Sequence, residues 1–131
     1  MTEEKKNGKT ILVVEDEEDM RKLLSIRLRQ AGFFVEMAED GEKALNMARQ
    51  IRPDLIILDL MLPHLSGGEV CKAVREDDDE EIAHIPIIML TANATDVDRI
   101  VGKVIGANYY MTKPFHFPEV LKNIRQTLGT S

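Results

Sequence analysis

The sequence predicts an α/β protein in which a five-stranded parallel sheet is covered by helices on both faces. Short apolar runs alternate with amphipathic helical patterns along the chain, and no long linker interrupts them. Strict alternation of this kind is typical of parallel sheets whose strands are connected by helices. Two runs, at 55–58 and 86–90, lack polar alternation, as expected for strands buried on both sides. Right-handed crossovers leave few topologies open, and the doubly wound order 2-1-3-4-5 is one of them.

Each element is predicted from its local pattern. The strands are expected at residues 10–14, 33–38, 55–58, 86–90 and 109–111, where the sequence is apolar and rich in β-branched or aromatic side chains. Helices are expected from 19 to about 31, at 41–50, 66–74 and 97–105, and from 118 onward, where apolar residues recur at helical spacing.

The first helix has a clear amphipathic pattern. Met20, Leu23, Leu24 and Leu28 are expected to lie on one face, toward the core. Asp19 is the expected N-cap because a short acidic side chain can accept a hydrogen bond from the first helical turn.

Composition limits the classes of function. The chain has 131 residues, 44% of them hydrophobic and 31% charged, which is enough for one domain, expected at 10–131 after a polar tail at 1–9. The net charge of -6 argues against direct nucleic-acid binding, which favours basic surfaces. The single cysteine, Cys71, indicates a reducing, cytoplasmic setting. No apolar run is long enough to cross a membrane, and no signal peptide or membrane association is predicted.

Chemical groups follow four of the predicted strands. Glu15 and Asp16 follow the first, Asp59 the third and Thr91 the fourth, and Lys113 follows the fifth. Ligands of open α/β sheets bind at the carboxyl ends of the strands. In the order 2-1-3-4-5 the first and third strands are neighbours, about 4.8 Å apart, so Asp16 and Asp59 are expected side by side.

This set of groups predicts a divalent metal and a phosphoryl ligand. Two carboxylates about 4 Å apart repel by roughly 4 kcal/mol at an effective dielectric near 20, and one lysine cannot offset three of them. A divalent cation can, and an all-oxygen site suits Mg²⁺. The remaining ammonium and hydroxyl suit a tetrahedral anion. A carboxylate nucleophile, a metal and a lysine together are the groups needed to form an acyl phosphate.

At this point the sequence resembles the receiver domains of bacterial two-component response regulators. The stretches that match are ILVVEDE (11–17), PDLIILDLMLP (53–63), PIIMLTA (86–92) and GANYYMTKPF (106–115). The resemblance implies the flavodoxin-like (βα)5 fold. Receiver domains are known for the order 2-1-3-4-5, so the resemblance, and not the alternation alone, selects it.

The resemblance also implies a role for each residue of the acidic group. Asp59 matches the phosphoacceptor. Asp16 and Glu15 match the acidic pair that holds Mg²⁺, Asp16 directly and Glu15 often through water. Asp59 and the backbone carbonyl of Met61 match the other protein ligands of the metal.

Three further residues match the parts of the family that respond to phosphorylation. Thr91 matches the hydroxyl that turns toward the phosphoryl group, and Lys113 matches the lysine that pairs with it. Tyr110 matches the aromatic switch that swings inward when Thr91 moves. The bond from Lys113 to Pro114 is often cis in the family.

The implied function is that of a signalling phosphoacceptor, which catalyses only its own phosphorylation and dephosphorylation. A sensor histidine kinase or phosphotransfer protein would supply the phosphoryl group. Phosphorylation would change binding to a downstream effector protein or domain through the face formed by the fourth helix (97–105), the fifth strand (109–111) and the last helix. The same face is a possible homodimer interface.

Some alternatives remain open from the sequence. A small-molecule phosphatase that works through an aspartyl phosphate needs the same nucleophile and metal. Glu15 and Asp16 could instead cap the first helix, and Tyr110 could simply pack in its strand. The acidic run at 76–81 is expected to be a solvated loop. No DNA-binding or catalytic domain is seen after the last helix, so the output could be that of a stand-alone receiver, a transcription-regulator fragment or a hybrid-kinase fragment.

Overall fold

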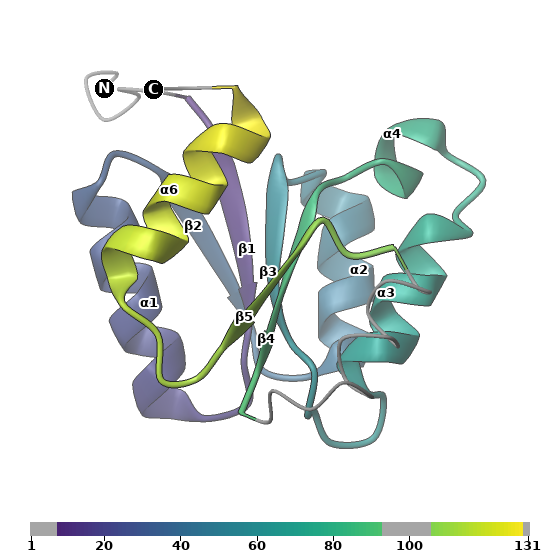
Figure 1. Cartoon of the computed structure of the whole chain (residues 1–131). Coiled ribbons are helices and arrows are strands. Elements are labelled where there is room, and N and C mark those ends of the chain that lie inside the picture. Colours follow the sequence, from purple (N-terminus) through teal and green to yellow (C-terminus); the bar gives the residue numbers. More distant parts are fainter. Residues whose placement is uncertain (1–7, 93–105, 130–131) are drawn as a thin grey trace.

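The computed structural model describes residues 8–92 and 106–129. A five-stranded parallel sheet runs through the middle of the molecule in the order β2-β1-β3-β4-β5, which confirms the predicted topology (Figure 1). The strands are β1 (Thr10–Val14), β2 (Phe34–Ala38), β3 (Leu55–Asp59), β4 (Ile87–Thr91) and β5 (Tyr109–Thr112). All residues of β3 and β4 are buried, as their unbroken apolar runs predicted.

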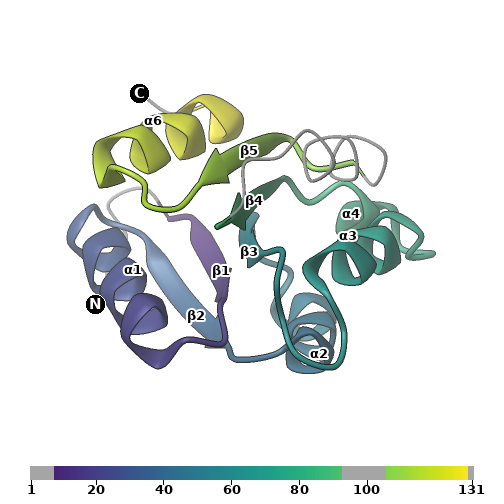
Figure 2. The same ribbon diagram turned by 60° about the horizontal axis from the view of Figure 1, so that its bottom comes forward.

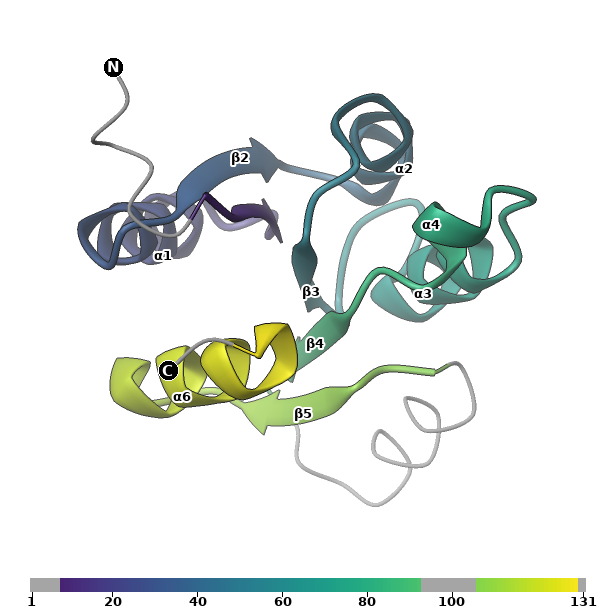
Figure 3. The same cartoon turned by 90° about the horizontal axis from the view of Figure 1, so that it is seen from above.

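Helices cover both faces of the sheet. They are α1 (Glu18–Gln30), α2 (Gly41–Ile51), α3 (Gly67–Arg75), α4 (Glu80–Ala83) and α6 (Phe117–Leu128). Seen from above, α1 and α6 lie on one side of the sheet, and α2, α3 and α4 on the other (Figure 3). The helix predicted at 97–105 lies outside the described residues.

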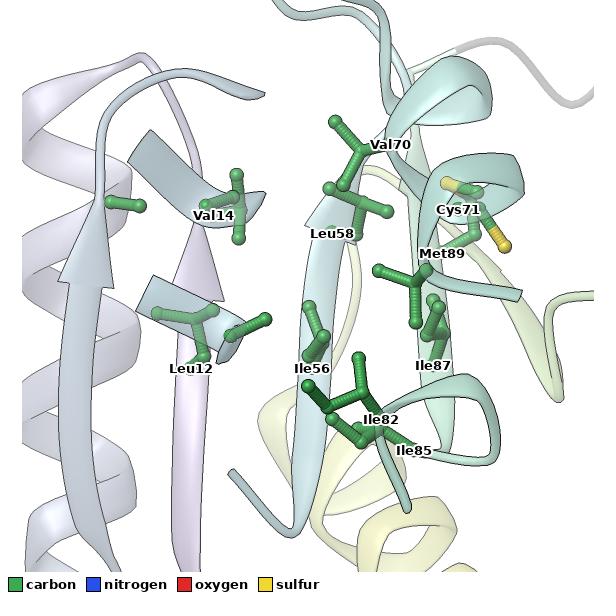
Figure 4. Close-up of a cluster of buried hydrophobic side chains, with 14 of the residues drawn as sticks. Leu12, Val14, Ile56, Leu58, Val70, Cys71, Ile82, Ile85, Ile87 and Met89 are labelled. Carbon is green, nitrogen blue, oxygen red and sulfur yellow. The ribbon is translucent and has the colours of Figure 1, made fainter. Parts of the chain in front are cut away.

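Each face of the sheet has its own hydrophobic core. Beneath α2, α3 and α4, side chains such as Leu12, Ile56 and Met89 pack against Val70 and Ile82 of the helices (Figure 4). The opposite core joins alternate residues of the same strands, among them Ile57 and Leu90, to α1 and α6. The two-residue period of a strand explains why successive residues enter different cores.

Two details of α1 differ from the prediction. Its N-cap is Glu17 and not Asp19, and Glu17 makes no side-chain capping hydrogen bond. Asp19 lies in the first turn, where its negative charge interacts favourably with the helix dipole. Leu23 is 50% exposed, because the face that packs on the sheet is narrower than the apolar stripe in the sequence and centres on Leu24 and Leu28.

The acidic run at 76–81 was predicted to be a solvated loop, and this was wrong only at its end. Its last two residues begin the one-turn helix α4, whose N-cap Asp79 accepts a hydrogen bond from the Glu81 N–H. Ile82 is buried against the core and holds this turn in place. Arg52 of the α2 C-cap forms ion pairs with Asp79 and Glu81, so part of the acidic charge is paired.

Within residues 8–92 and 106–129, every helix is too short or too polar to reach across a bilayer.

Candidate functional site

The predicted site residues meet at one edge of the sheet. Glu15 and Asp16 follow β1 directly, Asp59 and Thr91 are the last residues of β3 and β4, and Lys113 follows β5. These strand ends lie at the bottom of Figure 1 and come forward in Figure 2. The parallel arrangement therefore brings together groups that are widely separated in the sequence.

Lys113 connects two of the three carboxylates. Its Nζ lies 2.8 Å from Glu15 Oε1 and 3.0 Å from Asp59 Oδ2. Both carboxylates are nearly inaccessible to solvent, whereas the ammonium is partly exposed. Charge-assisted bonds of this length between buried groups fix the lysine side chain at the end of β3. The Lys113–Pro114 bond is cis, as the family resemblance implied.

Glu15 is held by both its backbone and its side chain. Its N–H donates to the Ala38 carbonyl, its Oε1 accepts from Lys113, and its Oε2 accepts from the Glu17 N–H. Burial raises the pKa of Glu15, and the hydrogen bond from Lys113 only partly opposes that rise, while the nearby Asp59 charge adds to it. Glu15 is thus a rigid, buried acid.

The same contacts stabilise the charged form of Lys113. Burial lowers the pKa of Lys113, but its hydrogen bonds to Glu15 and Asp59 outweigh this and leave the pKa above the ordinary lysine value. At neutral pH the lysine is therefore an ammonium, able to pair with an anion that enters the site.

The three carboxylates are close enough together to hold a metal ion. One oxygen each from Glu15, Asp16 and Asp59 lies within 4.8 Å of the others. Asp16 is exposed, while the other two are buried. A group of three carboxylate oxygens, open to water on the Asp16 side, fits the ligand preference of Mg²⁺, which keeps part of its water shell.

Asp59 is positioned through the backbone that follows it. Its Oδ1 accepts a hydrogen bond from the Met61 N–H at 3.0 Å, which places the Met61 backbone beside the carboxylate. The Gly67 N–H donates to the Leu60 carbonyl at 2.9 Å, so the start of α3 lies against the end of β3. A Cβ on Gly67 would overlap the Asp59 carbonyl oxygen, and only glycine permits this approach.

Thr91 and Tyr110 lie next to this edge. Thr91 is buried, and its carbonyl accepts from the Lys113 N–H at 2.7 Å, which ties the ends of β4 and β5 together. Tyr110 is half-buried and packs against the core beneath α3 and α4. Met89 pairs with Tyr110, and alternation along β4 places Thr91 on the same face as Met89.

A comparison with protein-family models identifies the chain. The model described as the response regulator receiver domain matches residues 11–125, nearly the whole described fold. The chain belongs to the receiver domain family. The resemblance found in the sequence is thereby confirmed.

Curated relatives of this receiver domain are response regulators or transcriptional regulators by name. It is 46% identical over 124 residues to the alkaline phosphatase synthesis transcriptional regulatory protein PhoP of Bacillus subtilis, covering 95% of this chain and 50% of PhoP. It is 47% identical over 118 residues to the probable transcriptional regulator ycf27 of Guillardia theta, covering 90% of this chain and 44% of that protein. The chain thus spans about half the length of these relatives.

A solved structure of another receiver domain supports the fold. It is the receiver domain of the sensor histidine kinase PA1611 from Pseudomonas aeruginosa PAO1, with a magnesium ion coordinated in its active-site cleft. The two chains are 33% identical with a TM-score of 0.86, and the match covers 94% of this chain and 99% of the other. The phosphatase alternative is not supported, because the matches are to receiver domains and response regulators.

Two features of the receiver domain were not expected from the sequence. The close approach of Gly67 to β3 could have been suspected from the Gly67–Gly68 pair, since glycines at a helix start are poor helix formers. A hydrogen bond from Arg21 of α1 to the carbonyl of Glu15 had no such signal. The alternative that Glu15 and Asp16 cap α1 finds no support, since the cap is Glu17.

Proposed function

We propose that this receiver domain accepts a phosphoryl group on Asp59 from a phosphohistidine and thereby controls an effector. The observation that carries the proposal is the environment of Asp59. A buried carboxylate at the end of the central strand lies 3.0 Å from the ammonium of Lys113 and within 4.8 Å of two further carboxylates. These groups can hold a nucleophile, a cation and a phosphoryl group together.

The transfer uses an Asp59 oxygen as nucleophile. The oxygen attacks phosphorus, the nitrogen–phosphorus bond of the phosphohistidine breaks, and the imidazole leaves with the electron pair of that bond. The product is an acyl phosphate. Lys113 already contacts Asp59 and Glu15, and it is placed to pair with a phosphoryl oxygen once one arrives. The chemistry is limited to the domain's own phosphorylation and dephosphorylation.

Asp16, Glu15 and Asp59 are the residues proposed to hold Mg²⁺, together with the backbone carbonyl of Met61. When bound, Mg²⁺ supplies positive charge that balances the carboxylates and the phosphoryl oxygens. Asp16 is the exposed member of the group and is proposed as a direct ligand. Glu15 is buried and bonded to Lys113, and is proposed to act through water.

Thr91 and Tyr110 are proposed to convert phosphorylation into a change of surface. Thr91 lies at the end of β4, and its carbonyl accepts a hydrogen bond from the Lys113 N–H. A shift of Thr91 toward the phosphoryl group would therefore also shift the end of β5. Tyr110 is half-buried against the core, and it is proposed to move between an inner and an outer position. The responding face comprises β5, α6 and the predicted helix at 97–105, which lies outside the described residues. The result is a population shift between two surface states.

The proposed partners follow from this chemistry. A sensor histidine kinase or a phosphotransfer protein donates the phosphoryl group, and an effector protein or domain, or a second copy of this domain, binds the responding face. PhoP and ycf27 are named as transcriptional regulators and are about twice as long as the region matched here. Any contact with DNA is proposed to be made by such an effector and not by this acidic chain.

Phosphorylation by acetyl phosphate with Mg²⁺ tests the proposal without a partner kinase. Intact-mass spectrometry should show one added phosphoryl group, lost on treatment with hydroxylamine, which cleaves acyl phosphates. Asp59→Asn should abolish the modification, while Asp19→Asn, which removes an exposed charge from α1, should leave it intact. A magnesium-dependent acyl phosphate in Asp59→Asn would overturn the assignment.

A further inference from the structure

Arg21 contacts the acidic loop from the first turns of α1. Its Nη1 donates to the Glu15 carbonyl at 2.9 Å and lies 3.4 Å from the Asp16 carbonyl. The side chain is half-buried over the loop between β1 and α1. The hydroxyl of buried Ser25 donates a hydrogen bond to the Arg21 carbonyl at 2.8 Å, so the backbone of Arg21 is also held within α1.

The loop that Arg21 contacts carries both members of the acidic pair. Glu15 is fixed through its own carboxylate, which bonds to Lys113 and to the Glu17 N–H. Asp16 is different, because its side chain is exposed. The direction of its carboxylate therefore depends on how firmly the backbone on either side is held, and Arg21 is bonded to that backbone.

We propose that Arg21 is a positioning residue for the divalent cation: its guanidinium fixes the backbone of Glu15 and Asp16 so that the exposed Asp16 carboxylate points into the metal site. The inference rests on the proposed function, since it concerns the same cation. It assigns Arg21 no contact with metal or phosphoryl group.

A positioning role and a purely electrostatic role of Arg21 predict opposite changes in Mg²⁺ affinity. A guanidinium near the site repels a cation, so removing its charge alone would tighten Mg²⁺ binding. Loss of positioning has the opposite effect, because an unrestrained loop must be ordered when the metal binds. Outer-shell contacts to metal ligands typically contribute tenfold or more to affinity.

The helix offers a matched control. Arg29, near the other end of α1, also donates a guanidinium hydrogen bond to a main-chain carbonyl, that of Val35, at 3.1 Å. Arg29→Gln and Arg21→Gln therefore remove the same charge and the same kind of bond from one helix. Only Arg21→Gln affects the acidic loop.

Calorimetric titration of the folded chain with Mg²⁺ tests the proposal. Arg21→Gln should weaken Mg²⁺ binding by about tenfold, and Arg21→Lys, which can still donate to a carbonyl, should recover part of the loss. Arg29→Gln should bind as the unchanged chain does. Melting curves in EDTA verify that each variant is folded at the titration temperature.

The outcomes are distinguishable. Equal or tighter Mg²⁺ binding by Arg21→Gln would overturn the positioning role while leaving the proposed function intact. An equal loss in Arg29→Gln would also overturn it, since the effect would then belong to the helix as a whole. Full Mg²⁺ binding by Asp16→Asn, or none by the unchanged chain, would overturn the proposed metal site and this inference with it.

Discussion

Replacing Asp16 by asparagine should stabilise the fold in the absence of metal. Asp16 shares its site with Glu15 and Asp59, and Lys113 is bonded to those two carboxylates. Asp16 therefore adds a third negative charge to a pair already held by the lysine. The Asp16 charge therefore destabilises the metal-free state, and it contributes a ligand when a cation binds.

The size of the effect follows from the separation of the carboxylates. The carboxylate oxygens lie within 4.8 Å of one another, and at that limit two unit charges repel by about 0.9 kcal/mol in bulk water and by about 3.5 kcal/mol at an effective dielectric of 20. Asp16 is exposed, so the lower part of this range applies to each neighbour. Asp16→Asn should thus stabilise the metal-free domain by about 1–2 kcal/mol. For 131 residues this corresponds to a rise in melting temperature of roughly 4–7 °C.

Thermal melting followed by circular dichroism at low salt measures this shift. The unchanged chain and Asp16→Asn are compared in EDTA and then in excess Mg²⁺, where the order should reverse because the variant has lost a ligand. Asp19→Asn removes a charge from the first turn of α1, which favours acids, and should melt no higher than the unchanged chain. If Asp16→Asn melts at or below the unchanged chain in EDTA, repulsion does not dominate the metal-free site.

Three further predictions concern Gly67, Arg75 and Glu15. Gly67→Ala should cost about 2–3 kcal/mol in urea unfolding, since the new Cβ meets backbone atoms that cannot move aside cheaply. Arg75→Ala should cost about 2–4 kcal/mol, because its half-buried guanidinium bonds to three main-chain carbonyls, whereas Arg49→Ala, which breaks an exposed ion pair, should cost less than about 1 kcal/mol; equal losses would contradict this. Burial raises the pKa of Glu15 above its ordinary value of 4.5. The stability that the protonated Glu15 side chain gives to the fold is therefore complete below pH 4.5 and is lost as pH rises through the raised pKa. Urea unfolding in EDTA from about pH 4 to 7 should therefore show the unchanged chain losing stability relative to Glu15→Gln, and parallel curves would refute this.

The sheet and the gathering of the site residues could be predicted from the sequence because both follow from regular rules. Unbroken apolar runs marked β3 and β4, and parallel strands place their carboxyl ends at one edge. Asp59, Thr91 and Lys113 could therefore be assigned to one place without knowing any contact between them. The strand order itself came from the family resemblance.

Other features depend on contacts that no local pattern encodes. The turn of α4 has only four residues, and the burial of Ile82 that fixes it is a tertiary contact. Lys113 and Glu15 are 98 positions apart, so their bond could not be read from spacing. The spacing of apolar residues predicted that Leu23 is buried, but Leu23 is exposed. Spacing identifies the apolar face of a helix and does not show how much of that face the sheet covers.

The bond from Lys113 to the acidic edge has a consequence for folding during synthesis. Glu15, Asp16 and Asp59, at the ends of β1 and β3, are all synthesised before residue 113. Docking of β5 brings in the ammonium, so the last strand contributes electrostatic attraction as well as backbone hydrogen bonds. The C-terminal part of the chain thereby completes the sheet and supplies the ammonium that pairs with two of the three carboxylates.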